Sequence, residues 1–177
     1  MAEMEASIVV DAPLREVYNQ WTQFEDFPRF MEGVLQVRQL DDKRLHWRAK
    51  VGGSEKEWEA EIVDQVPDQR IAWKNLLGAQ NAGAVLFEAV PEGTKVTLKL
   101  VYEPEGVTDV VGDALGFLTR RVKGDLERFK EFIEDRGEET GAWRGEVPAS
   151  PRPGETLPFG GAGDGDGHAP GPRNRLI

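Results

Sequence analysis

Cysteine is absent from the 177-residue chain, which excludes disulfide bonds and thiolate metal sites. This absence is typical of the reducing cytoplasm, where we expect the protein to reside. Long apolar runs are lacking too: no stretch reaches the length of about 18 residues that a membrane-spanning helix requires. The acidic first residues also lack the charged and apolar regions of a signal peptide.

Basic residues are the minority, with 22 Lys and Arg against 32 Asp and Glu and a net charge of −10. Because nucleic acids and anionic membrane surfaces require basic patches, we expect neither as a partner. Histidine occurs only at His46 and His168. No metalloprotease His/Glu spacing, phosphate-binding glycine loop or nucleophile elbow is present. The sequence therefore predicts no metal and no cofactor, and it leaves the catalytic residues unknown.

The longest helical pattern covers Gly106–Gly137, and the rest of the chain is interpreted around it. Its apolar residues recur at alternating steps of three and four, which places them on one stripe of a helix. A helix of about 30 residues is some 45 Å long, so this stripe needs a broad apolar partner. The stripe consists of Val111, Leu115, Leu118, Val122, Leu126, Phe129 and Ile133.

Two strands flanking Gly52-Gly53 provide the clearest part of that partner. The dipeptide suits a two-residue hairpin turn, and closing the turn fixes the pairing of Leu45–Val51 with Ser54–Val66. Opposite charges then meet on one face and apolar residues on the other, which indicates an antiparallel sheet with one wet side. The predicted pairs are Lys50 with Glu55, Arg48 with Glu57, His46 with Glu59, Arg44 with Glu61, Trp47 with Trp58, and Leu45 with Ala60.

The remaining segments complete an α+β fold of about six to seven strands. A helix begins at Pro13 with Leu14, Val17 and Trp21 on its buried face, and Pro28 separates it from a second short helix. The other strands are Glu5–Val10, Gly33–Leu40, Gln69–Asn75, Ala82–Val90 and Thr94–Tyr102. We expect Ile62 opposite Trp73, and a last hairpin around Glu92-Gly93 that aligns Phe87 with Leu98 and Val85 with Leu100.

The composition changes after Gly137. Residues 138–177 are rich in Gly, Pro, Ser and charge, so they bury too little apolar surface to offset the entropy of ordering. We therefore predict one domain over residues 1–137 and a disordered tail over 138–177. Trp143, Leu157 and Phe159 in the tail are candidates for docking on the domain or on a protein partner.

Local motifs follow the same order as the predicted elements. They are Val10-Asp11-Ala12-Pro13 with Val17-Tyr18, Phe24-Glu25-Asp26-Phe27-Pro28-Arg29-Phe30-Met31, Trp47-Arg48, Glu57-Trp58-Glu59-Ala60-Glu61-Ile62, Arg70-Ile71-Ala72-Trp73 and Gly93-Thr94-Lys95-Val96-Thr97. With them, residues 3–136 resemble the START and polyketide cyclase/dehydrase (SRPBCC) superfamily, near the coenzyme-Q-binding START-like bacterial proteins. The resemblance implies a helix-grip fold, in which the sheet curves around the long C-terminal helix and encloses a cavity for a lipid, quinone or polyketide.

Three tryptophans fall on one face of the predicted sheet and either line such a cavity or fill a packed core. Gly112 and Gly116 in the long helix either leave room at a cavity mouth or mark a frayed first turn. The candidate ligand-binding residues are Trp47, Trp58, Trp73, Phe87, Leu98, Leu100, Tyr102, Val111, Leu115 and Leu118, with Tyr18, Gln36, Asn75, Asn81 and Tyr102 as polar candidates.

Asp125 lies at the edge of the helix stripe. It either points inward, as an acid or base in low dielectric, or pairs with Arg121 or Arg128 on the helix surface.

Three functions remain open. The first is a carrier or sensor of a hydrophobic small molecule, and the second is a polyketide cyclase or dehydratase. The third is an interaction protein whose tail recruits a partner. The sequence leaves the oligomeric state open.

Overall fold

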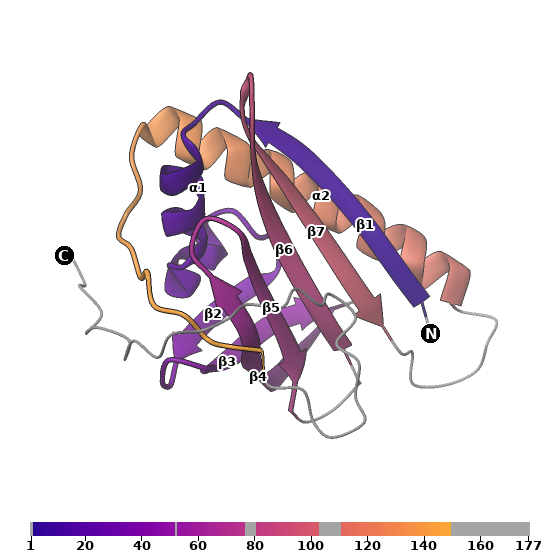
Figure 1. The fold of residues 1–177 in the computed structure, drawn as a ribbon. Coiled ribbons are helices and arrows are strands. Elements are labelled where there is room, and N and C mark those ends of the chain that lie inside the picture. Colours follow the sequence, from indigo (N-terminus) through magenta and orange to yellow (C-terminus); the bar gives the residue numbers. More distant parts are fainter. Residues whose placement is uncertain (1, 52, 77–80, 103–110, 150–177) are drawn as a thin grey trace.

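The computed structural model describes residues 2–51, 53–76, 81–102 and 111–149, without the side chains of residues 2, 51, 81, 102 and 111–115. The fold is α+β: one seven-stranded antiparallel sheet in the order β1-β7-β6-β5-β4-β3-β2 curls around the long helix α2 (Figure 1). The elements are β1 Ala2–Val10, α1 Leu14–Trp21, the 3₁₀ helix η1 Phe24–Arg29, β2 Val34–Gln39, β3 Arg44–Val51, β4 Ser54–Val66, β5 Arg70–Asn75, β6 Asn81–Val90, β7 Gly93–Tyr102 and α2 Val111–Arg136.

The register of β3 and β4 is confirmed at every predicted pair, including Trp47 with Trp58 and Arg48 with Glu57. The next pair, Ile62 with Trp73 between β4 and β5, is also confirmed, and a β-bulge follows it. Alternation of charge and apolar residues fixed these registers because a one-residue slip exchanges the two faces.

The predicted register of the last hairpin is wrong by two residues. Phe87 was expected opposite Leu98, but it pairs with Val96, and the other pairs of β6 and β7 shift equally. The turn is centred on Pro91-Glu92, with Gly93 as its last residue. This arrangement suits the preference of β-turns for proline at the second position and glycine at the fourth. The slip is even, so every side chain keeps its predicted face.

Helix α2 lies alongside β1 (Figure 1). Lys130 Nζ donates a hydrogen bond to the Val9 carbonyl at 3.1 Å, and the Asp11 amide donates to Glu134 Oε1 at 2.7 Å. Gly137, with φ +75°, ends the helix in the left-handed conformation that favours glycine. The prediction began the helix at Gly106, and residues 106–110 lie outside the described residues.

The second half of α2 is buried at Val122, Leu126, Phe129 and Ile133. The prediction of plain core holds for Phe129 and Ile133, whereas Val122 and Leu126 also line a cavity between α2 and the sheet. Phe129 meets Trp21 and Phe30 in edge-on contacts, with ring centroids 4.9 and 5.2 Å apart. Edge-on aromatic pairs add about 0.5–1.5 kcal/mol each beyond their burial. Since Trp21 of α1 and Phe30, the residue after η1, supply two of these rings, they fix where α2 crosses the sheet.

The tail does not begin at residue 138, because residues 138–149 pack on the domain. Trp143 and Val147 are buried, and Val147 forms an isolated bridge with Gln65 of β4. Arg144 donates two hydrogen bonds to the Asp68 carboxylate, at 3.0 and 2.7 Å. The prediction of disorder is therefore wrong for 138–149, where two apolar anchors and a bidentate pair offset the Gly and charge content. Residues 150–177 lie outside the described residues.

Candidate ligand cavity

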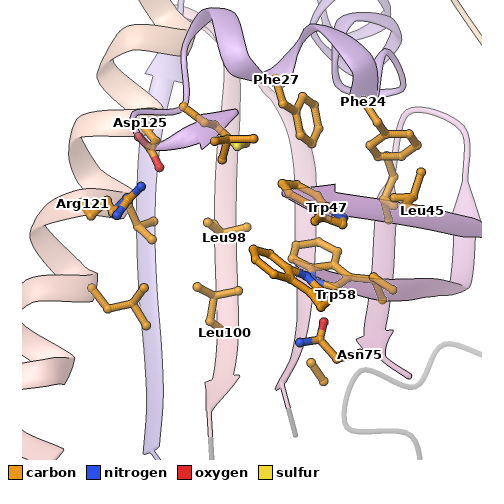
Figure 2. A pocket seen from close by; sticks show the side chains of 18 of the residues that line it. Phe24, Phe27, Leu45, Trp47, Trp58, Asn75, Leu98, Leu100, Arg121 and Asp125 are labelled. Carbon is orange, nitrogen blue, oxygen red and sulfur yellow. The ribbon is translucent and has the colours of Figure 1, made fainter. Parts of the chain in front are cut away.

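A cavity of about 430 Å³ lies between the sheet and α2 (Figure 2). The inner faces of β3, β4, β5 and β7 form one wall, and α2 forms the opposite wall. Trp21, Phe24, Phe27 and Met31 from the α1–η1 region line a third side. Small-molecule sites typically enclose roughly 300–1,000 Å³ and are mainly apolar, so this cavity has the size and lining of a ligand site.

Most of the predicted ligand-binding residues lie at this cavity. Trp47, Trp58, Trp73, Leu98, Leu100 and Leu118 line it. Tyr102, Val111 and Leu115 belong to β7 and α2, but their side chains lie outside the described part of the structure. Whether these residues bind a ligand remains a prediction.

Phe87 corrects the predicted set of ligand-binding residues, because it is not among the residues that line the cavity. It is 7% exposed and packs edge-on against Tyr18 and Trp21, with centroids 5.3 and 6.2 Å away. The two-residue shift of the last hairpin is the reason. The shift brings Val85 rather than Phe87 opposite Leu98, so Phe87 lies further along β6 beneath α1.

The tryptophan wall, made of Trp47, Trp58 and Trp73, is flat on its β3–β4 side. Trp47 and Trp58 stack with centroids 5.9 Å apart and planes 8° from parallel. Gly83 of β6 makes room for the third indole: a Cβ there would lie 2.5 Å from the Trp73 ring. All three indoles are half-buried, as expected for rings that face a cavity rather than a filled core.

Polar side chains at the cavity are few. Among the described lining residues, the amide and charged ones are Asn75, Arg121 and Asp125. Figure 2 shows Arg121 and Asp125 on α2 and Asn75 across the cavity on the sheet, near Trp58. Of the other polar candidates, Tyr18 is buried and accepts a 3.0 Å hydrogen bond from Gln65, whereas Gln36 is exposed on β2. The Asn81 side chain lies outside the described residues.

Asp125 combines the two arrangements that the sequence left open, since it lines the cavity and also pairs with Arg128. Its Oδ1 accepts a hydrogen bond from the Glu32 amide at 3.1 Å. Burial raises the pKa of Asp125, and these hydrogen bonds and the nearby Arg121 only partly oppose that effect. A carboxyl group with a raised pKa at an apolar cavity is a candidate proton donor.

Arg121 is the charged cavity residue that sequence reasoning missed as a site residue. Its guanidinium donates to the Glu32 carbonyl and lies over Gly33, where any Cβ would clash with it. Gly33 also has φ +83°, a conformation that favours glycine. The available signal was spacing, because Arg121 follows Leu118 by three and precedes Asp125 by four along the helix stripe.

In the described residues, no helix is long and apolar enough to span a membrane. Nor does that part of the chain gather three His, Cys, Asp or Glu side chains in a metal-binding arrangement.

Solved structures share this fold. A protein of Deinococcus radiodurans is 28% identical, with a TM-score of 0.61 over 77% of this chain and 99% of its own. A Thermus thermophilus protein is 21% identical, with a TM-score of 0.67 over 77% and 100%. The Zhui aromatase/cyclase of a Streptomyces species is 16% identical, with a TM-score of 0.65 over 80% and 98%.

These likenesses define a helix-grip protein, and two sequence comparisons specify it further. The family model for polyketide cyclase/dehydrase and lipid transport matches residues 10–131. An uncharacterised 17.2 kDa protein of Streptomyces lincolnensis is 52% identical over 149 residues, covering 83% of this chain and 99% of that protein. The chain belongs to the polyketide cyclase/dehydrase and lipid transport family.

Proposed function

We propose that the protein binds a hydrophobic or amphipathic small molecule, of lipid, quinone or polyketide type, in the cavity between the sheet and α2. The observation that carries this proposal is the 430 Å³ cavity, lined by four tryptophans with only three amide or charged side chains among its described residues. In a cavity of this size with apolar walls, the binding free energy is most favourable when an apolar ligand displaces the water. The family match supports the same class of ligand.

The experiment uses a neutral apolar dye, N-phenylnaphthylamine, whose fluorescence rises in apolar surroundings. We expect saturable binding to the wild-type protein and loss of that binding in Leu100→Trp. Leu100 lines the cavity and points into it in Figure 2, so a larger indole at this position occupies the ligand volume. Thr97→Trp on the same strand is the control, since Thr97 follows the opposite parity to Leu98 and Leu100. Equal binding by all three proteins would contradict the proposed site.

A second candidate function is a polyketide cyclase or dehydratase, and one observation favours it. Asp125, whose pKa is raised by burial, lies at the cavity with Arg121 one helical turn earlier. In an aldol closure, the α-carbon of one ketone first loses a proton to water, and the resulting enolate carbon attacks the carbonyl carbon of a second ketone. The ketone oxygen takes up a proton to become a hydroxyl, which later leaves with another α-proton as water. In this second proposal, Asp125 donates the proton that the ketone oxygen takes up, and Arg121 stabilises the developing oxyanion.

The test for this second function is turnover of a poly-β-keto thioester by wild-type protein and by Asp125→Asn. An enzyme that uses Asp125 loses turnover by a factor of about 10²–10⁴ in this variant, while dye binding is retained. Dye binding without turnover by the wild-type protein supports a carrier or sensor. The third hypothesis, an interaction protein without a working cavity, requires that the wild-type protein binds neither dye nor substrate.

A further inference from the structure

Arg121 brings a positive charge to the wall of an apolar cavity. A guanidinium has five N–H donors, and the Glu32 carbonyl is the one acceptor that Arg121 reaches among the described residues. No described carboxylate forms an ion pair with it. Water screens a half-buried cation beside apolar side chains less than one on the open surface, so an anion that enters the cavity is attracted to it more strongly.

The neighbouring acid, Asp125, forms its ion pair with another arginine. Asp125 is already engaged by Arg128 and by the Glu32 amide. Glu32 itself faces outward, with its side chain 78% exposed and 3.7 Å from Arg128. Arg128 therefore forms ion pairs with two carboxylates, whereas Arg121 forms none among the described residues. Arg121 is therefore the cationic side chain at the cavity that has no ion-pair partner among the described residues.

We propose that the cavity selects an amphipathic anion, whose apolar body lies against the tryptophan wall and whose single oxyanion binds Arg121. This inference rests on the proposed ligand-binding function and narrows its ligand class. The planar donor fork of arginine matches the two oxygens of a carboxylate or related oxyanion. A neutral lipid or hydrocarbon of the same size leaves the charge of Arg121 without a partner and binds more weakly.

The test compares two dyes that differ by one charge: anilinonaphthalene sulfonate and its neutral analogue N-phenylnaphthylamine. Both are titrated into wild-type protein, Arg121→Gln and Arg121→Lys. Glutamine keeps a donor toward the Glu32 carbonyl but removes the charge, whereas lysine keeps the charge. Arg120→Gln is the matched control, because Arg120 is the adjacent arginine of α2 and is exposed. Urea midpoints establish that each variant is folded.

We expect Arg121→Gln to weaken sulfonate binding about tenfold or more, the effect of losing a hydrogen bond to a charged group. The neutral dye should bind within about twofold of wild type, Arg121→Lys should retain most of the sulfonate affinity, and Arg120→Gln should match wild type. Equal weakening of both dyes by Arg121→Gln would show that Arg121 only supports the fold, and no weakening of either would show that the cavity does not recognise charge. Both results overturn the inference and leave the cavity's binding function intact.

Failure of the proposed function is distinguishable, because wild-type protein would then bind neither dye. Aliphatic and planar aromatic acids share the required chemistry, and displacement of the sulfonate separates them. Naphthoate and decanoate compete in parallel, each beside its neutral partner, methylnaphthalene or decanol. The inference requires that at least one acid displaces the dye better than its neutral partner, with a difference that disappears in Arg121→Gln. Equal displacement of the dye by each acid and its neutral partner would contradict the inference.

Discussion

The interface between α2 and the sheet has a packed end and a cavity end, both built from apolar and aromatic residues. At the packed end, Phe30, Phe129 and Ile133 are each no more than 1% exposed. At the cavity end, the tryptophan wall is half-buried, and Phe117 of α2 is 50% exposed although it lines the cavity. Apolar composition is therefore similar at the two ends, while packing is not.

The difference comes from which elements fill the space. At the packed end, α1 and η1 insert aromatic rings between β6 and the second half of α2. At the cavity end, the sheet faces the first half of α2, where a Cβ at Gly116 would meet no described atom within 4 Å. A periodic apolar pattern shows which face of an element is buried, but only the fold shows whether side chains fill the space beside that face.

The largest expected effect is at the packed end. Phe129→Ala should destabilise the protein by about 3–5 kcal/mol, because it removes a fully buried ring and leaves a void. Leu118→Ala at the cavity end is the matched comparison and should cost about 1 kcal/mol, since Leu118 is half-buried beside existing space. Urea denaturation measures both, and equal losses would remove the distinction between the two ends.

The segment 138–149 should behave as part of the packed end. Trp143→Ala should cost about 3 kcal/mol, because the indole is 5% exposed and contacts the backbone at Gly145. Glu146→Ala, at an exposed position of the same segment, is the control and should leave the melting temperature nearly unchanged. An unchanged melting temperature in Trp143→Ala would show that this segment does not dock.

Trp58→Ala should separate stability from binding at the cavity end. Because the indole is half-buried, the free energy of unfolding should fall by about 1–2 kcal/mol, less than for a fully buried ring. Affinity for N-phenylnaphthylamine should fall as well, since the stacked Trp47–Trp58 pair loses one ring. Urea melts and dye titration measure the two quantities, and unchanged affinity in the folded variant would remove Trp58 from the site.

The smallest expected effect is the pH dependence of Asp125. Burial raises its pKa in the folded state, so the protein binds more protons there than when unfolded. The contribution of Asp125 to stability is therefore fully present below its ordinary pKa and is lost as pH rises through the raised one. Asp125→Asn should lack this loss and become more stable relative to wild type as pH rises above the ordinary pKa of an aspartate, about 3.9. A pH-independent difference in urea midpoints would contradict this result.

Much of the fold could be predicted from local patterns. Charge alternation specified the β3–β4 register, and the three–four spacing of Phe129 and Ile133 specified the buried face of α2. The last hairpin was misplaced because Pro91 and Gly93 together, rather than the Glu-Gly dipeptide, determine its turn. Trp143 was assigned to a disordered tail because composition averages over a segment, whereas a single buried indole can dock it.

The candidate site was predictable in part. Alternation placed the tryptophan wall on one face, but no pattern gives the distance between that wall and α2, and this distance creates the cavity. The roles of Arg121 and Asp125 depend on the backbone at Glu32 and Gly33, which is remote in sequence. Contacts of this kind arise only when the chain between them has folded.

Native mass spectrometry of the protein purified from its own host tests the central claim most directly. We predict that part of the wild-type protein carries one non-covalent small molecule, which dissociates on denaturation and is identified as an amphipathic acid. Leu100→Trp, purified in the same way, should lack this adduct because its indole fills the cavity. Ligand-free wild-type protein that also fails to bind added dye, or an adduct retained equally by Leu100→Trp, would contradict the account.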